Sequence, residues 1–185
     1  MIAGVGGQGV VYLTNLMVEG ALLADIPVAT SEIHGLSQRG GSVVAGLTFG
    51  ENSYGFIEKG GADFLIGLEP LEAQRSLPFL SPSSQVMIDD KRVFPFSVNS
   101  GKAVYPDVKE FVGFLDGNIT KVIYNQSFDS KLNPLHRNLF VLGQATRLVG
   151  FPVPVDSLEN TIAEMSKPML RDEAVRVFWL GVDGD

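Results

Sequence analysis

The chain contains no cysteine and only two histidines, His34 and His136, among its 185 residues. Without thiols it forms no disulfide, has no thiolate nucleophile and offers no sulfur ligand to an iron–sulfur cluster or a zinc ion. Two histidines leave little for metal binding through imidazole, and no metal-ligand helix motif is present. Any redox centre that this protein serves must therefore come from a bound cofactor or from a partner chain.

Basic residues are also scarce. The chain has 14 Lys and Arg against 21 Asp and Glu, a net charge of -7 and a sequence pI near 4.8, so a nucleic-acid partner is not expected. No apolar run reaches the roughly 18 to 20 residues that span a bilayer, and the N-terminus lacks a signal-peptide pattern. With 45% hydrophobic and 19% charged residues, we expect one cytoplasmic domain, residues 1–185, that does not contact a membrane.

Hydrophobic spacing predicts strands that alternate with helices. Strands are expected at 1–5, 26–30, 42–50, 54–58, 64–68, 85–89, 92–98 and 118–124. Helices are expected at 9–24, 70–77, 107–115, from about 134 to 149, from a capping box at Asp156 and Glu159, and at 168–180. Several strands are apolar on both faces, which is typical of a sheet covered on both sides. The fold class predicted is α/β, a Rossmann-like three-layer domain with a mostly parallel sheet.

The first glycine-rich stretch is "GVGGQGV", Gly4–Val10, between the first strand and the first helix. It matches G-x-G-x-x-G, whose helix N-terminus can bind a pyrophosphate. A dinucleotide fold also needs an acidic residue about 20 positions later, and Glu32 is the candidate. A free-standing NAD(P)-binding reductase is therefore one alternative, and a purely structural turn is another. The candidate binding residues here are Gly6, Gly7, Gln8 and Gly9.

A second loop, within "SEIHGLSQRGGSVV" at Ser31–Val44, follows the next expected strand. Its polar side chains gather where α/β proteins bind ligands, at the carboxyl end of a strand. An alternative is structural: Arg39 pairs with Glu32, and His34 caps a carbonyl group. The candidate binding residues in this loop are Glu32, His34, Ser37, Gln38 and Arg39.

The remaining polar residues do not complete a catalytic set. Asp89 and Asp90 are adjacent on a strand and point to opposite faces. Glu69 and Glu72 fall in the first turn of a helix, where negative charge offsets the helix dipole. His136 falls on a helix without polar neighbours. No serine occupies a nucleophile elbow, and no Walker lysine follows the glycines.

Five stretches together resemble the γ-type subunit of the 2-oxoacid:ferredoxin oxidoreductases, most closely the small β subunit of the indolepyruvate-oxidising members. They are "GVGGQGV" (Gly4–Val10), "SEIHGLSQRGGSVV" (Ser31–Val44), "GGADFLIGLEPLEAQR" (Gly60–Arg75), "YP" (Tyr105–Pro106) and "RNLFVLG" (Arg137–Gly143). They occur in the family's order and extend through most of the chain. Thr48 departs from the pattern, because the family often carries arginine there.

The resemblance implies an accessory subunit that is not active alone. The complex would oxidatively decarboxylate a 2-oxoacid, transfer the acyl group to coenzyme A and reduce ferredoxin. Indolepyruvate or another aryl pyruvate is the expected substrate, with pyruvate, a branched 2-oxoacid and 2-oxoglutarate as alternatives. Thiamine diphosphate and the iron–sulfur clusters would belong to larger catalytic partner subunits. By similarity, Gly6–Gly9 and Glu32–Gly41 would face the partner near thiamine and coenzyme A.

Overall fold

A computed structural model describes residues 1–34 and 41–184, and for residues 32–34 it describes the backbone only. In these residues the strands form one six-stranded sheet of order β2-β3-β1-β4-β5-β6. The strands are β1 (Ile2–Val5), β2 (Val28–His34), β3 (Ser42–Phe49), β4 (Ala62–Gly67), β5 (Leu80–Asp89) and β6 (Lys121–Asn125). β1, β4, β5 and β6 are parallel, whereas β3 runs antiparallel to both β1 and β2.

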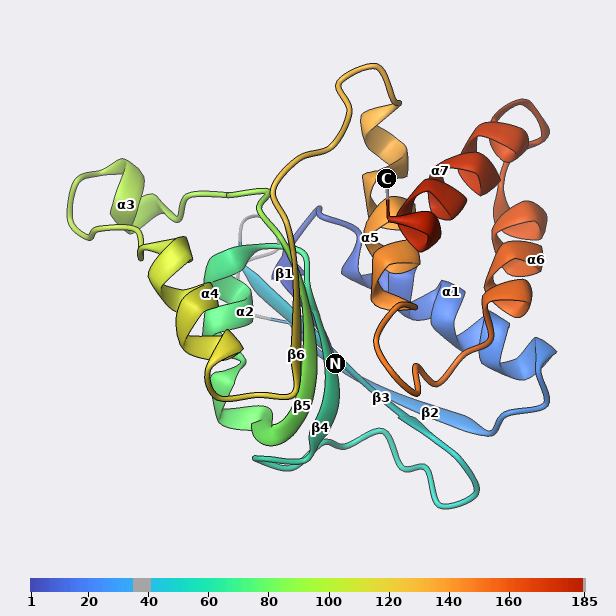
Figure 1. Ribbon diagram of the computed structural model, residues 1–185, viewed down its shortest axis with the longest axis horizontal. Helices are drawn as coiled ribbons and strands as arrows, with labels where there is room; N and C mark the ends of the chain where they lie inside the picture. Colours follow the sequence, from blue (N-terminus) through green and yellow to red (C-terminus); the bar gives the residue numbers. More distant parts are fainter. Residues whose placement is uncertain (35–40, 185) are drawn as a thin grey trace.

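Helices cover both faces of this sheet (Figure 1). One face carries α1 (Val10–Leu23), α5 (Arg137–Ala145), α6 (Val155–Met165) and α7 (Arg171–Asp183). The other face carries α2 (Pro70–Arg75) and α4 (Val108–Asp116), while α3 (Phe96–Asn99) stands away from the sheet. Short 3-10 turns are η1 (Leu77–Phe79), η2 (Pro134–His136) and η3 (Pro168–Leu170). The predicted layered α/β fold is confirmed. Of the helices described, none is long and apolar enough to cross a bilayer.

The buried core is divided by the sheet because successive strand residues point to opposite faces. Ile66 and Met87 pack with the α1, α5, α6 and α7 side. Leu65, Val86 and Ile88 pack with the α2 and α4 side. All five are 2% exposed or less, so the central strands are apolar on both faces, as the sequence predicts.

α5 and α7 approach each other at two glycines. A Cβ atom placed on Gly143 would overlap the carbonyl oxygen of Phe178, and one on Gly181 would overlap the carbonyl oxygen of Phe140. Backbone, not a flexible side chain, is the obstacle in both cases. The two helices are therefore in backbone contact, which only glycine at both positions permits.

The strand predicted at 54–58 is wrong. These residues form no strand and lie in the connection between β3 and β4. The backbone N–H groups of Tyr54 and Gly55 donate to the hydroxyl oxygen of Thr48, at 3.1 and 2.8 Å. A side chain thus takes the place of a strand partner, which an alternating apolar pattern does not reveal.

Two further local predictions are wrong. Residues 92–98 form no strand, because Pro95 is the N-cap of the short helix α3. The expected capping box is not formed either. α6 begins after Pro154 without a side-chain cap bond, and Asp156 lies inside its first turn. Proline fixes the backbone at both helix starts, so these helices begin without the side-chain acceptor that the sequence suggests.

Candidate functional site

The predicted site residues lie at or just after the ends of strands at one edge of the sheet, the upper edge in Figure 1. The four parallel strands end there at Val5, Gly67, Asp89 and Asn125. The antiparallel β3 begins at the same edge, where Ser42 pairs with Val5. α/β folds bind their ligands at this carboxyl edge. We refer to it as the carboxyl edge.

The glycine turn between β1 and α1 has two residues in the left-handed region. Gly7 has φ 95° and Gly9 has φ 85°, a conformation that favours glycine. The N–H of Gly6 donates to the carbonyl oxygen of Gly41 at 2.8 Å, which ties the turn to the start of β3. α1 has no side-chain cap, and the first N–H groups of a helix have no partner within the helix.

The side chain of Gln8 is bonded to the protein itself. Its Oε1 accepts from the N–H of Val5 at 2.7 Å, and its Nε2 donates to the carbonyl oxygens of Leu68 at 3.1 Å and Lys91 at 3.4 Å. Its own carbonyl oxygen accepts from Nδ2 of Asn138 on α5 at 2.6 Å. Gln8 therefore joins the ends of β1, β4 and β5 and shapes the turn. Partners up to 130 positions away carry no signal that sequence reasoning could have used.

Glu32 and His34 belong to β2, where they pair with Ala45 and Val43 of β3. The loop that continues from His34 leads back to β3 at the carboxyl edge. The predicted binding residues Ser37, Gln38 and Arg39 lie outside the described residues, and so does the predicted pairing of Arg39 with Glu32. Among the predicted site residues, the structure thus brings the end of β2 to the same edge as Gly6–Gly9.

The position of β2 differs from that in a dinucleotide-binding fold. There the second strand lies directly beside the first, and its last residues reach the ribose. Here β3 lies between β1 and β2. Because neighbouring strands are about 4.8 Å apart, the end of β2 is displaced to roughly 10 Å from β1. Glu32 is thus poorly placed to hold a ribose over the glycine turn.

A buried ion pair lies at the ends of β5 and β6. The guanidinium of Arg137 donates twice to the carboxylate of Asp89, both at 2.7 Å, and Asn125 donates to the same carboxylate at 2.8 Å. The side chain of Asp89 is only 2% exposed. The Arg137 guanidinium also lies over the ring of Phe128, 5.4 Å from its centroid. Three elements, β5, β6 and α5, are joined here.

Asp90 lies just beyond the end of β5, so it is not on the strand as predicted, and it bonds to a different arginine from Asp89. It accepts from Nε and Nη2 of Arg92 at 2.7 and 3.1 Å. Partial burial opposes ionisation of Asp90, but hydrogen bonds from Arg92 and Tyr124 outweigh it and hold the pKa of the carboxyl below its usual value. The two neighbouring carboxylates therefore have different partners, Arg137 and Asn125 for Asp89 and Arg92 for Asp90.

Glu69 is completely buried and serves two elements. It is the N-cap of α2, where its Oε2 accepts from the N–H of Glu72 at 2.9 Å. Its Oε1 accepts from the N–H of Val93 at 3.2 Å and from the hydroxyl of Tyr105. Burial and the Glu69 hydrogen bond raise the pKa of Tyr105. The predicted role of Glu69 in offsetting the helix dipole is thus incomplete, since this residue also holds the segment that follows β5.

His136 has a polar neighbour, which corrects the sequence prediction. It lies on η2, just before α5, and is 6% exposed. Its Nδ1 is 3.8 Å from a carboxylate oxygen of Glu173 on α7. Within the described ranges, 1–34 and 41–184, no three His, Asp or Glu side chains converge as a metal site would require.

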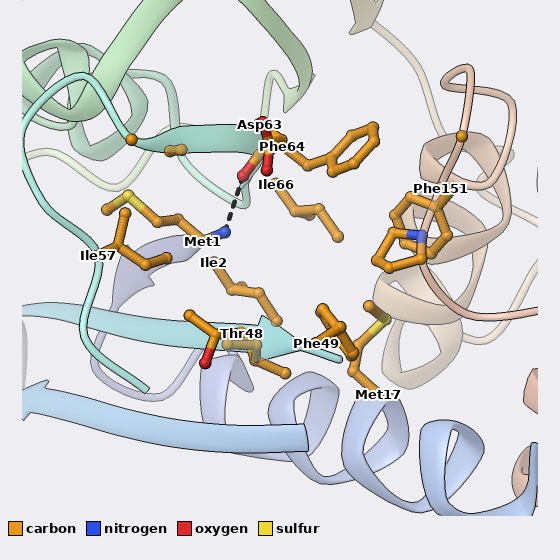
Figure 2. Close-up of a pocket in the computed structure, with 15 residues that line it drawn as sticks. Met1, Ile2, Met17, Thr48, Phe49, Ile57, Asp63, Phe64, Ile66 and Phe151 are labelled. Atoms are coloured by element: carbon orange, nitrogen blue, oxygen red, sulfur yellow. Dashed lines mark hydrogen bonds between the residues drawn. The ribbon is translucent and has the colours of Figure 1, made fainter. Parts of the chain in front are cut away.

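A cavity of about 410 Å³ lies at the opposite edge of the sheet, where β1 begins (Figure 2). Its lining is mostly apolar and includes Met17, Phe49 and Phe151. The amino group of Met1 donates to the carbonyl oxygen of Phe64 at 2.7 Å. The few polar groups of the cavity form no catalytic arrangement. The cavity lies at the start of β1, whereas the glycine turn follows the end of that strand.

Comparison with known proteins supports the sequence resemblance. Residues 1–183 match the family described as pyruvate ferredoxin/flavodoxin oxidoreductase. The curated protein "Indolepyruvate oxidoreductase subunit IorB" of Archaeoglobus fulgidus is 32% identical over 184 residues, covering 98% of this chain and 92% of that protein. Its namesake in Methanothermobacter thermautotrophicus is 34% identical over 180 residues, covering 96% of this chain and 92% of that protein.

Solved structures share the fold at lower identity. The γ subunit of keto/oxoacid ferredoxin oxidoreductase from Geobacter sulfurreducens has a TM-score of 0.68 at 17% identity, covering 98% of this chain and 94% of that chain. The 2-oxoglutarate:ferredoxin oxidoreductase from Magnetococcus marinus has a TM-score of 0.66 at 14% identity, covering 98% of this chain but 30% of that longer chain. Sequence, motif order and fold agree, and the chain belongs to the pyruvate ferredoxin/flavodoxin oxidoreductase family.

Proposed function

We propose that residues 1–185 form one γ-type domain that acts as an accessory subunit of a thiamine-dependent 2-oxoacid:ferredoxin oxidoreductase in the cytoplasm. The complex removes carbon dioxide from indolepyruvate or another aryl pyruvate, transfers the acyl group to coenzyme A and passes two electrons to ferredoxin. The observation that carries the proposal is the family match over residues 1–183 together with relatives named as indolepyruvate oxidoreductase subunits.

The geometry supports an accessory rather than a self-sufficient role. The chain has no cysteine to ligate an iron–sulfur cluster. Thiamine diphosphate is bound together with a divalent cation, yet the described residues contain no converging carboxylate and histidine ligands for one. These residues do not fit the cofactor by themselves. We therefore assign thiamine diphosphate and the clusters to larger catalytic partner subunits, where thiamine supplies the carbanion-stabilising chemistry of decarboxylation.

The part played by this chain is to shape one wall of the partner's site. In the proposal, Gly7 and Gly9 present backbone N–H groups at the start of α1. The N–H of Gly6 ties the turn to the start of β3, and Gln8 holds it against β4 and β5. Glu32 and His34 at the end of β2, with the following residues Ser37, Gln38 and Arg39, complete the surface toward thiamine and coenzyme A. Fixed N–H groups beside a reacting group are useful because they require no reorganisation during the reaction.

The alternative of an NAD(P)-dependent reductase is disfavoured by strand order. β3 separates β2 from β1, which places the end of β2 too far from the glycine turn for the usual ribose contact. Isothermal titration calorimetry with NADH and NADPH tests this alternative directly. The proposal predicts no saturable binding, and a micromolar dissociation constant would favour the reductase.

The proposed function is tested by reconstitution. The chain is co-expressed with the larger subunit, and reduction of ferredoxin is followed with coenzyme A and either indolepyruvate, pyruvate, a branched 2-oxoacid or 2-oxoglutarate. We expect turnover only when both subunits are present, and the highest kcat/KM with indolepyruvate. Turnover by the isolated chain would overturn the proposal, whereas turnover of the complex with another 2-oxoacid would overturn only the substrate.

A further inference from the structure

Residues 91–106, which we name the arm, leave the sheet after β5 and carry α3 away from the rest of the molecule (Figure 1). The arm exposes apolar side chains to an unusual degree. Phe94 is 47% exposed, Phe96 79% and Val104 94%. Three such residues within one short segment exceed the scattered exposure of a normal surface and are typical of an interaction site.

The base of the arm is fixed rather than loose. The buried carboxylate of Glu69 accepts from the N–H of Val93 and the hydroxyl of Tyr105, so it holds both ends of the arm. The rings of Phe94 and Tyr105 also meet edge to face, with centroids 5.0 Å apart. A buried acid placed to clamp a projecting segment pre-organises that segment for binding.

The tip of the arm is closed by its own backbone. The carbonyl oxygen of Ser97 accepts from the N–H groups of Lys102 and Ala103, at 2.8 and 3.0 Å. Asn99 donates from its side chain to the carbonyl oxygen of Phe94 at 3.0 Å. Phe96 and Val104 therefore project from a formed structure and not from an extended chain.

The charge of the arm is opposite to that of the chain. The arm contains Lys91, Arg92 and Lys102 and no acidic residue, although the whole chain carries a net charge of -7. Arg92 is paired with Asp90, while Lys91 and Lys102 are exposed and make no ion pair within the described residues. A partner that binds the arm should therefore place carboxylates around an apolar depression.

The comparisons point to the occupant. In the Magnetococcus marinus enzyme the same fold occupies 30% of a longer chain, so there it shares one polypeptide with other domains. The curated relatives, of which this chain covers 92%, are named as subunits, so an equivalent neighbour would lie on a separate subunit. A fixed, apolar, basic arm beside the carboxyl edge is suited to that contact.

We propose that the arm is the element that docks this chain onto the larger, catalytic subunit, with Phe96 and Val104 entering an apolar depression that is lined by acidic side chains. This proposal rests on the proposed function, because it presupposes that subunit. Docking through the arm would hold the carboxyl edge and its glycine turn against the partner. Lys91 and Lys102 at the margin would set orientation and association rate more than affinity.

The test measures binding of the intact chain to the purified larger subunit by biolayer interferometry. We expect Phe96→Asp and Val104→Asp each to weaken binding by at least about tenfold. Met169→Asp is the matched control, because Met169 is 97% exposed but lies on η3. Lys102→Glu should slow association at low salt, whereas Lys167→Glu, an exposed lysine just before η3, should not.

The outcomes separate the two proposals. Melting temperatures of the isolated variants should equal that of the wild type, because both side chains are mostly in solvent. If the wild type binds and the Phe96 and Val104 variants bind equally well, the arm proposal fails and the proposed function stands. If the wild type does not bind the larger subunit at all, both fail. If the isolated chain is a dimer that Phe96→Asp makes monomeric without affecting subunit binding, the arm joins two copies and the docking proposal is overturned.

Discussion

The carboxylate of Asp89, at the end of β5, accepts hydrogen bonds from Nε and Nη2 of Arg137 at the start of α5, each at 2.7 Å. Asn125 is a third donor, so the protein itself satisfies the hydrogen bonding of this buried carboxylate. This pair fixes α5 against the carboxyl edge. α5 in turn positions Asn138, whose side chain holds the backbone of the glycine turn.

Replacement of Arg137 by leucine should lower the free energy of unfolding by about 3–5 kcal/mol, because it leaves a buried carboxylate without its counter-ion. Arg137→Lys should recover part of that loss, since lysine keeps the charge but not the two-pronged geometry. Urea denaturation measures both. Arg171→Leu, at an exposed arginine, is the control and should change stability by less than about 0.5 kcal/mol. Equal stability of Arg137→Leu and the wild type would contradict the role of the pair.

Gln8 should prove necessary for its amide nitrogen as well as its oxygen. In Gln8→Glu the side chain can still accept from Val5, but it no longer donates to Leu68 and Lys91. We expect a loss of about 1–3 kcal/mol in chemical denaturation, with Gln8→Ala at least as severe. A Gln8→Glu variant as stable as the wild type would mean that the two donor bonds contribute nothing.

Alanine substitutions at Gly7 and Gly9 distinguish the cost of backbone strain from the cost of steric overlap. Both have positive φ, but a Cβ on Gly7 would meet nothing within 4 Å, whereas one on Gly9 would lie 2.5 Å from Nδ2 of Asn138. Gly7→Ala should cost about 1–2 kcal/mol from the left-handed backbone alone, and Gly9→Ala should cost more. Combining Gly9→Ala with Asn138→Ala should remove most of the excess. The double-mutant cycle is read from urea midpoints, and purely additive losses would refute the overlap.

The Tyr105 hydroxyl should control how firmly the arm is held. Tyr105→Phe removes the bond to Glu69 while keeping the ring that packs on Phe94. We expect faster amide hydrogen exchange in residues 91–106 and an unchanged rate in β5, because the loss is local. Hydrogen exchange followed by mass spectrometry resolves the two regions. If amide protection in the arm is the same in Tyr105→Phe and the wild type, the Val93 hydrogen bond and the Phe94–Tyr105 ring contact are enough to hold the arm.

Acid stability should depend on Asp90. Its pKa is lower in the folded chain than its usual value, so the ionised carboxylate contributes stability above its unfolded pKa, and that contribution disappears as the pH falls through the folded pKa. Asp90→Asn removes this titration. The difference in unfolding free energy between wild type and Asp90→Asn should therefore be largest near about pH 6 and shrink toward about pH 2. A difference that is constant with pH would contradict this account.

The sequence predicts the parts of the fold that depend on local pattern. Runs that are apolar on both faces locate β4 and β5, helical spacing locates α1, and Pro70 marks the first residue of α2. The predictions fail where a hydrogen-bond partner outside the local pattern, or a proline, determines the local structure. Residues 54–58 alternate like a strand, but their N–H groups bond to Thr48, and Pro95 starts a helix in the expected strand 92–98.

The candidate site shows the same division. The glycine turn and its place between a strand and a helix are readable because the motif is contiguous. The long-range contacts of Gln8, the burial of Glu69 and the pairing of Asp89 with Arg137 are not, since each joins residues dozens of positions apart. The insertion of β3 between β1 and β2 is likewise decided by strand pairing, and it changes what the glycine motif can bind.

The glycine contact between α5 and α7 has a consequence for the order of assembly. At Gly143 and Gly181 the backbones of the two helices meet without a side chain between them, so this part of the α5 surface is buried by α7. During synthesis, the α1 and α5 side of the sheet cannot complete its packing until α7 has been made. The β4, β5 and α2 side can pack earlier. The two layers of this fold are thus expected to mature at different times.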